Sequence, residues 1–165
     1  MFHHQEFGKT TILRDLVKNI SDELKIDVSI IDERGEIAAM YNGVSQNNVG
    51  IRTDILSYIQ KNIGIKMVIR SMSPKVIAAD EIGNEGDIEA INYALCSGVK
   101  GIFTAHGNDL QDLLRNKTMH VLIDKKVFER IIILDTERKG EVQNVYVLNK
   151  DTKQYEEVRR ARCEV

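Results

Sequence analysis

A short apolar run that ends in two acids limits the folds open to this chain more than any other feature. Residues 76–79 are Val, Ile, Ala and Ala, they lead directly into Asp80 and Glu81, and the run lies between Pro74 and Gly83. Such a run, bounded by turn residues, is typical of a strand buried in a parallel sheet. Open α/β sheets bind ligands at the carboxyl ends of their strands, so the two carboxylates stand where a site would be. The same pattern also fits a strand that ends in a solvated acidic turn.

The two acids suggest a specific chemistry. An aspartate such as Asp80 can hold Mg²⁺ through water, and a glutamate such as Glu81 can polarise an attacking water. This is the arrangement of the Walker B motif in nucleotide hydrolases. Apolar runs ending in acids also arise by chance, so the hypothesis needs support from other parts of the chain.

Size and composition favour one globular domain and exclude several classes. The chain has 165 residues, enough to bury a core, and 42% hydrophobic against 29% charged residues argues against disorder. A net charge of −2 gives no sign of a protein that coats nucleic acid. Cys96 and Cys163 form neither a metal-binding spacing nor a disulfide framework, which favours a reducing compartment. No run approaches the roughly 20 apolar residues of a membrane span, and no signal peptide is seen.

A second motif lies near the amino end. Gly8, Lys9, Thr10 and Thr11 precede an apolar stripe with helical spacing. Gly-Lys-Thr at the start of a helix is the second half of a phosphate-binding loop, in which the lysine reaches the phosphates and the threonine hydroxyl ligates Mg²⁺. The full motif requires glycine five residues before Gly8, where this chain has His3. Either the amino end is cut within or altered at the loop, or the tripeptide is a chance helix start.

The remaining pattern predicts an α/β fold with a largely parallel sheet, helices on both faces and a C-terminal β-hairpin. Strands are expected at residues 26–31, 76–82, 100–105 and 128–135, the last of them buried. Helices are expected from residue 12, from Thr53 through Ile63, over 87–97, after a cap at Asn108 or Asp109, and over 118–128. Residues 41–52 are expected to form a loop and 66–70 a short strand or a helix end. The hairpin is expected to join residues 142–148 to 155–158.

Polar groups follow three of the predicted strands. They are Asp32-Glu33-Arg34, Asp80-Glu81 and His106. Carboxyl ends of parallel strands share one edge, so these groups and the Gly8–Thr11 segment are expected in one crevice. A histidine in such a place is often structural, but a neutral imidazole could contact a γ-phosphate or its attacking water.

Phosphoryl transfer also needs cations, because negative charge spreads over the transferred group. Arg34, Arg52 and Arg70 are the candidates. Arg52 and Arg70 could act within one subunit or across a subunit boundary. All three could equally be ordinary surface arginines.

These segments together resemble a known family. Asp32-Glu33-Arg34 and residues 46–54, 69–74, 79–83 and 104–108 are similar to the stage III sporulation protein AA family, which is itself similar to the ATPases of type II and type IV secretion systems. The resemblance extends from Gly8 to about Val147. Secretion ATPases often have glycine where this chain has Asp80, so the acidic pair is closer to that of ordinary P-loop ATPases.

The resemblance implies a RecA-like P-loop fold that binds ATP and Mg²⁺. It implies a phosphate-binding motif at Gly8–Thr11, an Asp box at Asp32–Arg34, a Walker B motif at Asp80-Glu81 and a His box at His106. It also implies a single ATPase domain in the C-terminal part of a longer protein. That protein would form a ring, expected to be a hexamer, on the cytoplasmic side of a mother cell–forespore channel, with the channel proteins as partners.

Under this hypothesis, Lys9 binds phosphate, Thr10 and Asp80 hold Mg²⁺, and Glu81 activates water while Glu33 and His106 order the site. Two alternatives stay open. The segment 104–108 also resembles ATPases that carry a nucleic-acid-binding module, although the net charge and the lack of a basic, aromatic groove argue against nucleic acid as a partner. The other alternative is a non-hydrolysing scaffold, motivated by His3.

Overall fold

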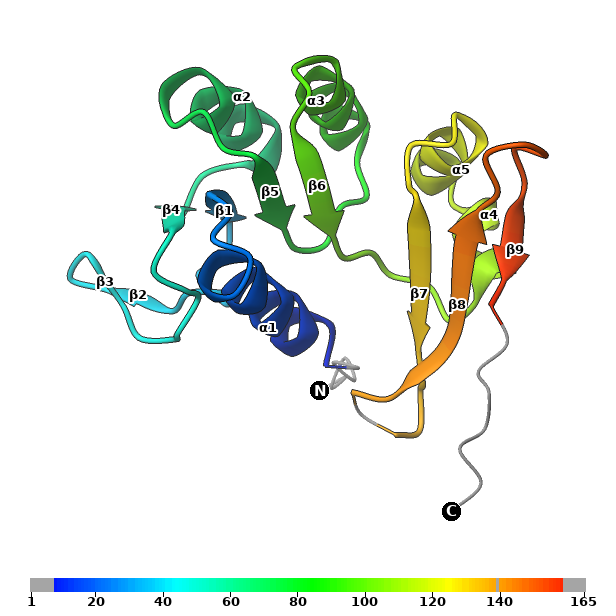
Figure 1. The fold of residues 1–165 in the computed structure, drawn as a ribbon, viewed down its shortest axis with the longest axis horizontal. Helices are drawn as coiled ribbons and strands as arrows, with labels where there is room; N and C mark the ends of the chain where they lie inside the picture. The colour runs from blue at the N-terminus through cyan, green and yellow to red at the C-terminus, as the bar shows by residue number, and fades with distance from the viewer. Residues whose placement is uncertain (1–7, 139, 159–165) are drawn as a thin grey trace. The chain divides into compact units, whose positions relative to one another are not determined.

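The computed structural model describes residues 8–138 and 140–158. The chain divides into two compact units, one comprising Lys9–His106 and the other containing Gly8 and the described residues from Gly107 onward. Figure 1 shows the helices and strands of both units. Within the described ranges, no helix has the combination of length and apolar character that a membrane span would require.

The first unit contains a four-stranded parallel sheet. Its strand order is β4 (Thr53–Ser57), β1 (Val28–Asp32), β5 (Val76–Ala79), β6 (Lys100–Phe103). The register places Ile31 opposite Ala79 in β5, and Ala79 opposite Phe103 in β6. The strands therefore end level with one another, and the residues that follow them emerge along one edge.

Helices cover both faces of this sheet, as predicted (Figure 1). Helix α1 (Lys9–Asp22) packs on one face, and α2 (Lys61–Ser71) and α3 (Glu85–Cys96) pack on the other. Successive side chains of a strand point to opposite faces. Ile30 accordingly packs in the cluster of α1, whereas its neighbour Ile31 packs with α2 and α3. The sheet is buried on both sides, which explains the continuous apolar runs of β1 and β5.

The prediction of a helix from Thr53 is wrong. Residues Thr53–Ser57 form β4, which pairs in parallel with β1, and the helix begins only at Lys61. Ile55 and Leu56 pack against opposite faces of the sheet. Pairing with the free edge of β1 overrides the helical spacing of the apolar residues here. Residues 66–70 consequently lie inside α2, so the helix alternative for them is correct and the strand alternative is wrong.

The segment expected to be a loop contains a small hairpin. Strands β2 (Met40–Tyr41) and β3 (Val44–Ser45) pair antiparallel around Asn42-Gly43. Both turn residues have positive φ, 47° and 78°. This conformation is the one that an Asn-Gly turn favours.

The second unit consists of α4 (Leu110–Arg115), α5 (Lys117–Asp124) and an antiparallel sheet β7 (Arg130–Leu134), β8 (Val142–Leu148), β9 (Tyr155–Glu157). The predicted β8–β9 hairpin is confirmed, and so is Asp109 as the N-cap of α4. The strand predicted over residues 128–135 is present as β7, but it is buried on one face only, because Ile131 and Ile133 are buried while Ile132 is 46% exposed. β7 pairs with β8 in an antiparallel sheet, where one face can remain open.

Candidate functional site

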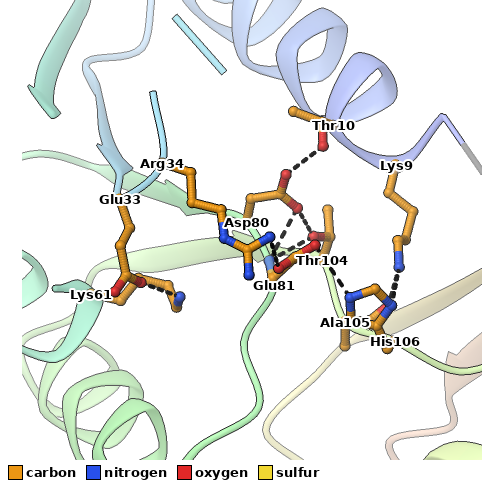
Figure 2. Close-up of polar contacts among 10 residues, drawn as sticks. All are labelled: Lys9, Thr10, Glu33, Arg34, Lys61, Asp80, Glu81, Thr104, Ala105 and His106. Atoms are coloured by element: carbon orange, nitrogen blue, oxygen red, sulfur yellow. Dashed lines mark hydrogen bonds and ion pairs between the residues drawn. The ribbon is translucent and has the colours of Figure 1, made fainter. Parts of the chain in front are cut away.

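Polar side chains from distant parts of the chain meet at the edge where the parallel strands end. Figure 2 shows side chains from the start of α1, from the loop after β1, from the residues after β5 and from those after β6. α1 also begins at this edge, because Lys9 and Thr10 reach residues that follow β5 and β6. The structure therefore brings together the groups that the sequence placed in one crevice.

Asp80 is the best-anchored of these groups. Its Oδ2 accepts a hydrogen bond from the Thr10 hydroxyl, and its Oδ1 accepts one from the Thr104 hydroxyl and one of 3.0 Å from the amide of Glu81. A carboxylate and a hydroxyl side by side are hard oxygen ligands of the kind that Mg²⁺ prefers. Mg²⁺ usually takes one or two protein carboxylates and completes its shell with water and phosphate, and this donor set fits that requirement. The described residues contain no cluster of three or more acidic, histidine or cysteine ligands that could hold a metal ion.

Glu81 is held in an uncommon backbone conformation. Its φ is +53°, a left-handed value that costs a non-glycine residue roughly 1–3 kcal/mol. Its amide donates to the Thr104 hydroxyl at 2.9 Å, and the next amide, of Ile82, donates to the Thr104 carbonyl at 2.8 Å. Thr104 thus connects the end of β6 to the acidic pair after β5 and holds the strained residue in place.

The carboxylate of Glu81 has a basic partner on each oxygen. Nη1 of Arg34 lies 2.6 Å from Oε2, and Nε2 of His106 lies 3.2 Å from Oε1. The side chain of Glu81 is 25% exposed, whereas those of Arg34 and His106 are 62% and 65% exposed. The acid is therefore shielded while its two partners face solvent, where they could reach a ligand.

Lys9 lies beside His106. Its Nζ donates to the carbonyl of Ala105 at 3.2 Å and lies 3.1 Å from Nδ1 of His106. Since an ammonium can only donate, Nδ1 accepts and the proton of the neutral ring is on Nε2, which faces Glu81. Burial lowers the pKa of Lys9, and the nearby charges of Glu81 and Asp80 oppose this shift. A cation that is only partly compensated by its surroundings would gain from an anionic ligand such as phosphate.

A second ion pair borders the site. Nζ of Lys61, the first residue of α2, contacts Oε2 of Glu33. A cavity open to solvent lies between this pair and the acidic pair, lined by Asp32, Glu33, Arg34, Glu36, Lys61, Asp80 and Glu81. Asp32 itself is 2% exposed and accepts the amides of Ile37 and Ala38, so it shapes the turn after β1.

Other predicted site residues do not join this cluster. Arg52 pairs with Asp27 at 2.7 Å. These two residues directly precede β4 and β1, so they lie at the amino ends of the strands, and the acidic pair lies beyond the carboxyl ends. Arg70 lies in the last turn of α2, where it donates to the hydroxyl of Tyr93 at 3.4 Å and lies over its ring. Thr11 is exposed on α1. Gly8 is buried with φ +77° at the start of α1, and the residues before it lie outside the described ranges.

Sequence reasoning missed Thr104 and Lys61 as site residues. Thr104 could have been found as the first polar residue after the strand that leads to His106. Lys61 carried no comparable signal, because the wrong helix assignment from Thr53 through Ile63 placed it in the last turn of a helix and not at the start of one.

Comparison with known proteins places this chain in a family. The model of the family described as "Sporulation stage III, protein AA" matches residues 3–153. The chain belongs to this family. It is 39% identical over 144 residues to stage III sporulation protein AA of Bacillus subtilis, a match that covers 84% of this chain and 47% of that protein. It is also 34% identical over 119 residues to the protein ycf45 of Porphyra purpurea, covering 70% of this chain and 21% of that protein.

A solved structure shares the fold of this member of the sporulation stage III protein AA family. The X-ray structure of the Legionella pneumophila ATPase DotB matches with a TM-score of 0.57 at 14% identity, covering 90% of this chain and 44% of DotB. The likeness shows a P-loop ATPase fold, as the sequence resemblance implied. The chain spans less than half the length of each of these proteins.

Proposed function

We propose that this chain binds and hydrolyses ATP as the motor part of a secretion-type ATPase. The observation that carries the proposal is the pairing of the Thr10 hydroxyl with the Asp80 carboxylate, 70 residues away, beside Lys9 and Glu81. Membership of the sporulation stage III protein AA family and the shared fold with DotB support it.

Each side chain of the site has a proposed role. Lys9 binds the phosphates from the start of α1, where the helix dipole also favours an anion. Thr10 and Asp80 hold Mg²⁺, which when bound neutralises phosphate charge. Gly8 and the backbone amide of Thr11 complete the phosphate-binding segment. These roles correspond to those of the Lys and Thr in a phosphate-binding loop.

Glu81 is the proposed general base. It accepts a proton from the attacking water at one of its carboxylate oxygens. Both oxygens have protein partners, so the departure of Arg34 or His106 would leave one oxygen more open to the attacking water. Arg34 is the more suitable group to move to the γ-phosphate, because a guanidinium can contact two phosphate oxygens at once. His106 then holds Glu81, whose freed oxygen orients the water.

The assembly and its setting are also proposals. The protein would act as a ring-shaped homo-oligomer, a hexamer by analogy with secretion ATPases, at the cytoplasmic face of a membrane channel of the sporulation apparatus. Arg52 and Arg70 point away from the acidic pair of their own subunit, so any catalytic role for them would be on a neighbouring subunit.

The proposal is tested by the release of phosphate from ATP by the full-length protein. Turnover is expected only with Mg²⁺, and Asp80→Asn should lower it because the neutral amide oxygen is a weaker ligand for Mg²⁺ than the charged carboxylate. Asp151→Asn, in an exposed turn of the second unit, is the matched control. Hydrolysis that is equally fast in Asp80→Asn or without a divalent metal would contradict the proposal.

A further inference from the structure

Lys61 is a largely buried cation to which no role has been assigned so far. Its side chain is only 10% exposed, whereas its partner Glu33 is 37% exposed. A lysine is rarely buried to this extent unless it is paired. The ion pair therefore holds Glu33 more than it holds Lys61, because the lysine is fixed by its surroundings and the glutamate is not.

At its position Lys61 does not stabilise the helix to which it belongs. It is the first residue of α2, where the helix dipole is positive and a cation is unfavourable. The first turn of α2 contains no acidic residue, and the side chain of Gln60 does not cap it. The carboxylate of Glu33 compensates the ammonium of Lys61. A residue that breaks a local rule in this way without a gain for the helix is a candidate for a functional role.

Glu33 and Arg34 fix the loop after β1 from two sides. Glu33 extends to Lys61 and Arg34 extends to Glu81, as Figure 2 shows. The next residue, Gly35, has φ +75°, and a Cβ there would lie 2.9 Å from the ring of Tyr58. The side chain of Arg34 is 62% exposed, so its packing cannot hold it beside Glu81. Its place therefore depends on the ion pair with Glu81 and on the course of the loop backbone.

We infer that Lys61 is a positioning residue which, by holding Glu33, sets the place of Arg34 beside the acidic pair. Lys61 does not touch the nucleotide in this account. Its loss would let the loop drift and would lower turnover through Arg34. The inference deepens the proposed function and rests on it, since Arg34 is assigned there to the γ-phosphate.

The test is a double-mutant cycle with Lys61→Met and Arg34→Ala in the full-length protein. Lys61→Met is expected to lower kcat about 10- to 100-fold, the range that a small misplacement of a catalytic group can cost. Its affinity for ATP should stay within about twofold of wild type, because the binding groups Lys9 and Thr10 are untouched. In the Arg34→Ala background Lys61→Met should have little further effect, because both changes disable the same group.

The matched control is Lys66→Met. Lys66 lies one turn later on α2 and pairs with Glu89 at 2.9 Å, but their side chains are 36% and 76% exposed. This surface pair should contribute little, and kcat should not change. Should Lys61→Met not fold, Lys61→Gln takes its place in the same cycle, because its shorter, neutral side chain loses the ion pair with Glu33 and keeps a polar group at this position.

A second measurement separates this inference from the proposed function. Hydrogen exchange of a peptide covering residues 33–38, measured without nucleotide, should rise in the Lys61 variant and not in Lys66→Met. If that occurs in a protein without ATPase activity, the loop contact stands and the proposed function fails. Unchanged exchange and a kcat equal to that of Lys66→Met would overturn the inference. An undiminished effect of the Lys61 variant in the Arg34→Ala background would also overturn it.

Discussion

Nη1 of Arg34 lies 2.6 Å from Oε2 of Glu81, so the cation proposed for the phosphate is bound to the acid proposed as the base. The other oxygen of Glu81 lies 3.2 Å from Nε2 of His106. A phosphate that attracts Arg34 would free one oxygen of Glu81 for the attacking water. Under the proposed function, arrival of the substrate and exposure of the base would be coupled through this ion pair.

Arg34→Ala should lower kcat by about 10²-fold, similar to the loss of one donor that stabilises charge in a transition state. Arg34→Lys should recover only part of this loss, because an ammonium lacks the planar fork of the guanidinium. Steady-state phosphate release measures both. Faster turnover in Arg34→Ala would mean that the ion pair with Glu81 only inhibits, and it would contradict the assigned role.

Thr10 and Thr11 should respond differently to the same substitution. Thr10→Val removes the hydroxyl beside Asp80 and should raise the Mg²⁺ concentration needed for half-maximal turnover about 10- to 100-fold, as the loss of groups around a metal typically does. Thr11→Val keeps the backbone amide and changes only an exposed side chain, so the metal dependence should stay the same. A titration of turnover with Mg²⁺ distinguishes them. Equal effects at the two positions would argue against Thr10 as the metal ligand.

Lys9 should destabilise the fold at neutral pH. Burial lowers its pKa from the ordinary value of 10.5, so the folded chain holds this proton more weakly than the unfolded chain. The free energy of unfolding should therefore rise as pH increases from the lowered pKa toward 10.5. Lys9→Met should unfold at a higher urea concentration than wild type at pH 7, and this advantage should shrink toward pH 10.

The same Lys9→Met variant should lose affinity for nucleotide, since the phosphate-binding cation is gone. The control is Lys18→Met on the same helix α1, for which neither change is expected. A Lys9→Met protein that is less stable than wild type at pH 7 would show that the charge is not strained by burial.

Arg52 and Arg70 should not serve the acidic pair of their own subunit. Arg52 and Asp27 form an exposed ion pair, 45% and 52% exposed, so Arg52→Ala should lower the free energy of unfolding by less than about 1 kcal/mol. If either arginine acts across a boundary, mixing its alanine variant with Glu81→Gln subunits should restore part of the turnover. Full loss of activity in an alanine variant, with no recovery on mixing, would contradict action on a neighbouring subunit.

The buried strands and the shared edge could be predicted from the sequence because they depend on local patterns. The apolar residues before Asp80 are consecutive, so their spacing does not predict an amphipathic helix. Pro74 and Gly83 bound the run on either side. The helix at α3 was predicted from the apolar stripe that Gly98 ends. This strand and this helix can be predicted without knowing which residues they contact in the folded chain.

The errors occurred where distant partners decide the structure. Ile55 and Leu56 fit a helix by spacing, but the free edge of β1 recruits them as a strand. Lys61 could not be assigned because its partner Glu33 lies 28 residues away, and Thr104 acts on Asp80 from 24 residues away. Arg52 and Arg70 were candidates by residue type alone, and only the direction of their strand and helix removes them from this site.

The most direct test of the account is hydrolysis of ATP by Glu81→Gln in the full-length protein. Glutamine keeps the size of the side chain and cannot accept the proton, so turnover should fall by about 10²–10⁴-fold while ATP stays bound. Glu85→Gln, an exposed acid four residues later in the first turn of α3, serves as the control and should hydrolyse ATP at the wild-type rate. Wild-type turnover in Glu81→Gln would contradict the assignment of this acidic pair as the catalytic centre.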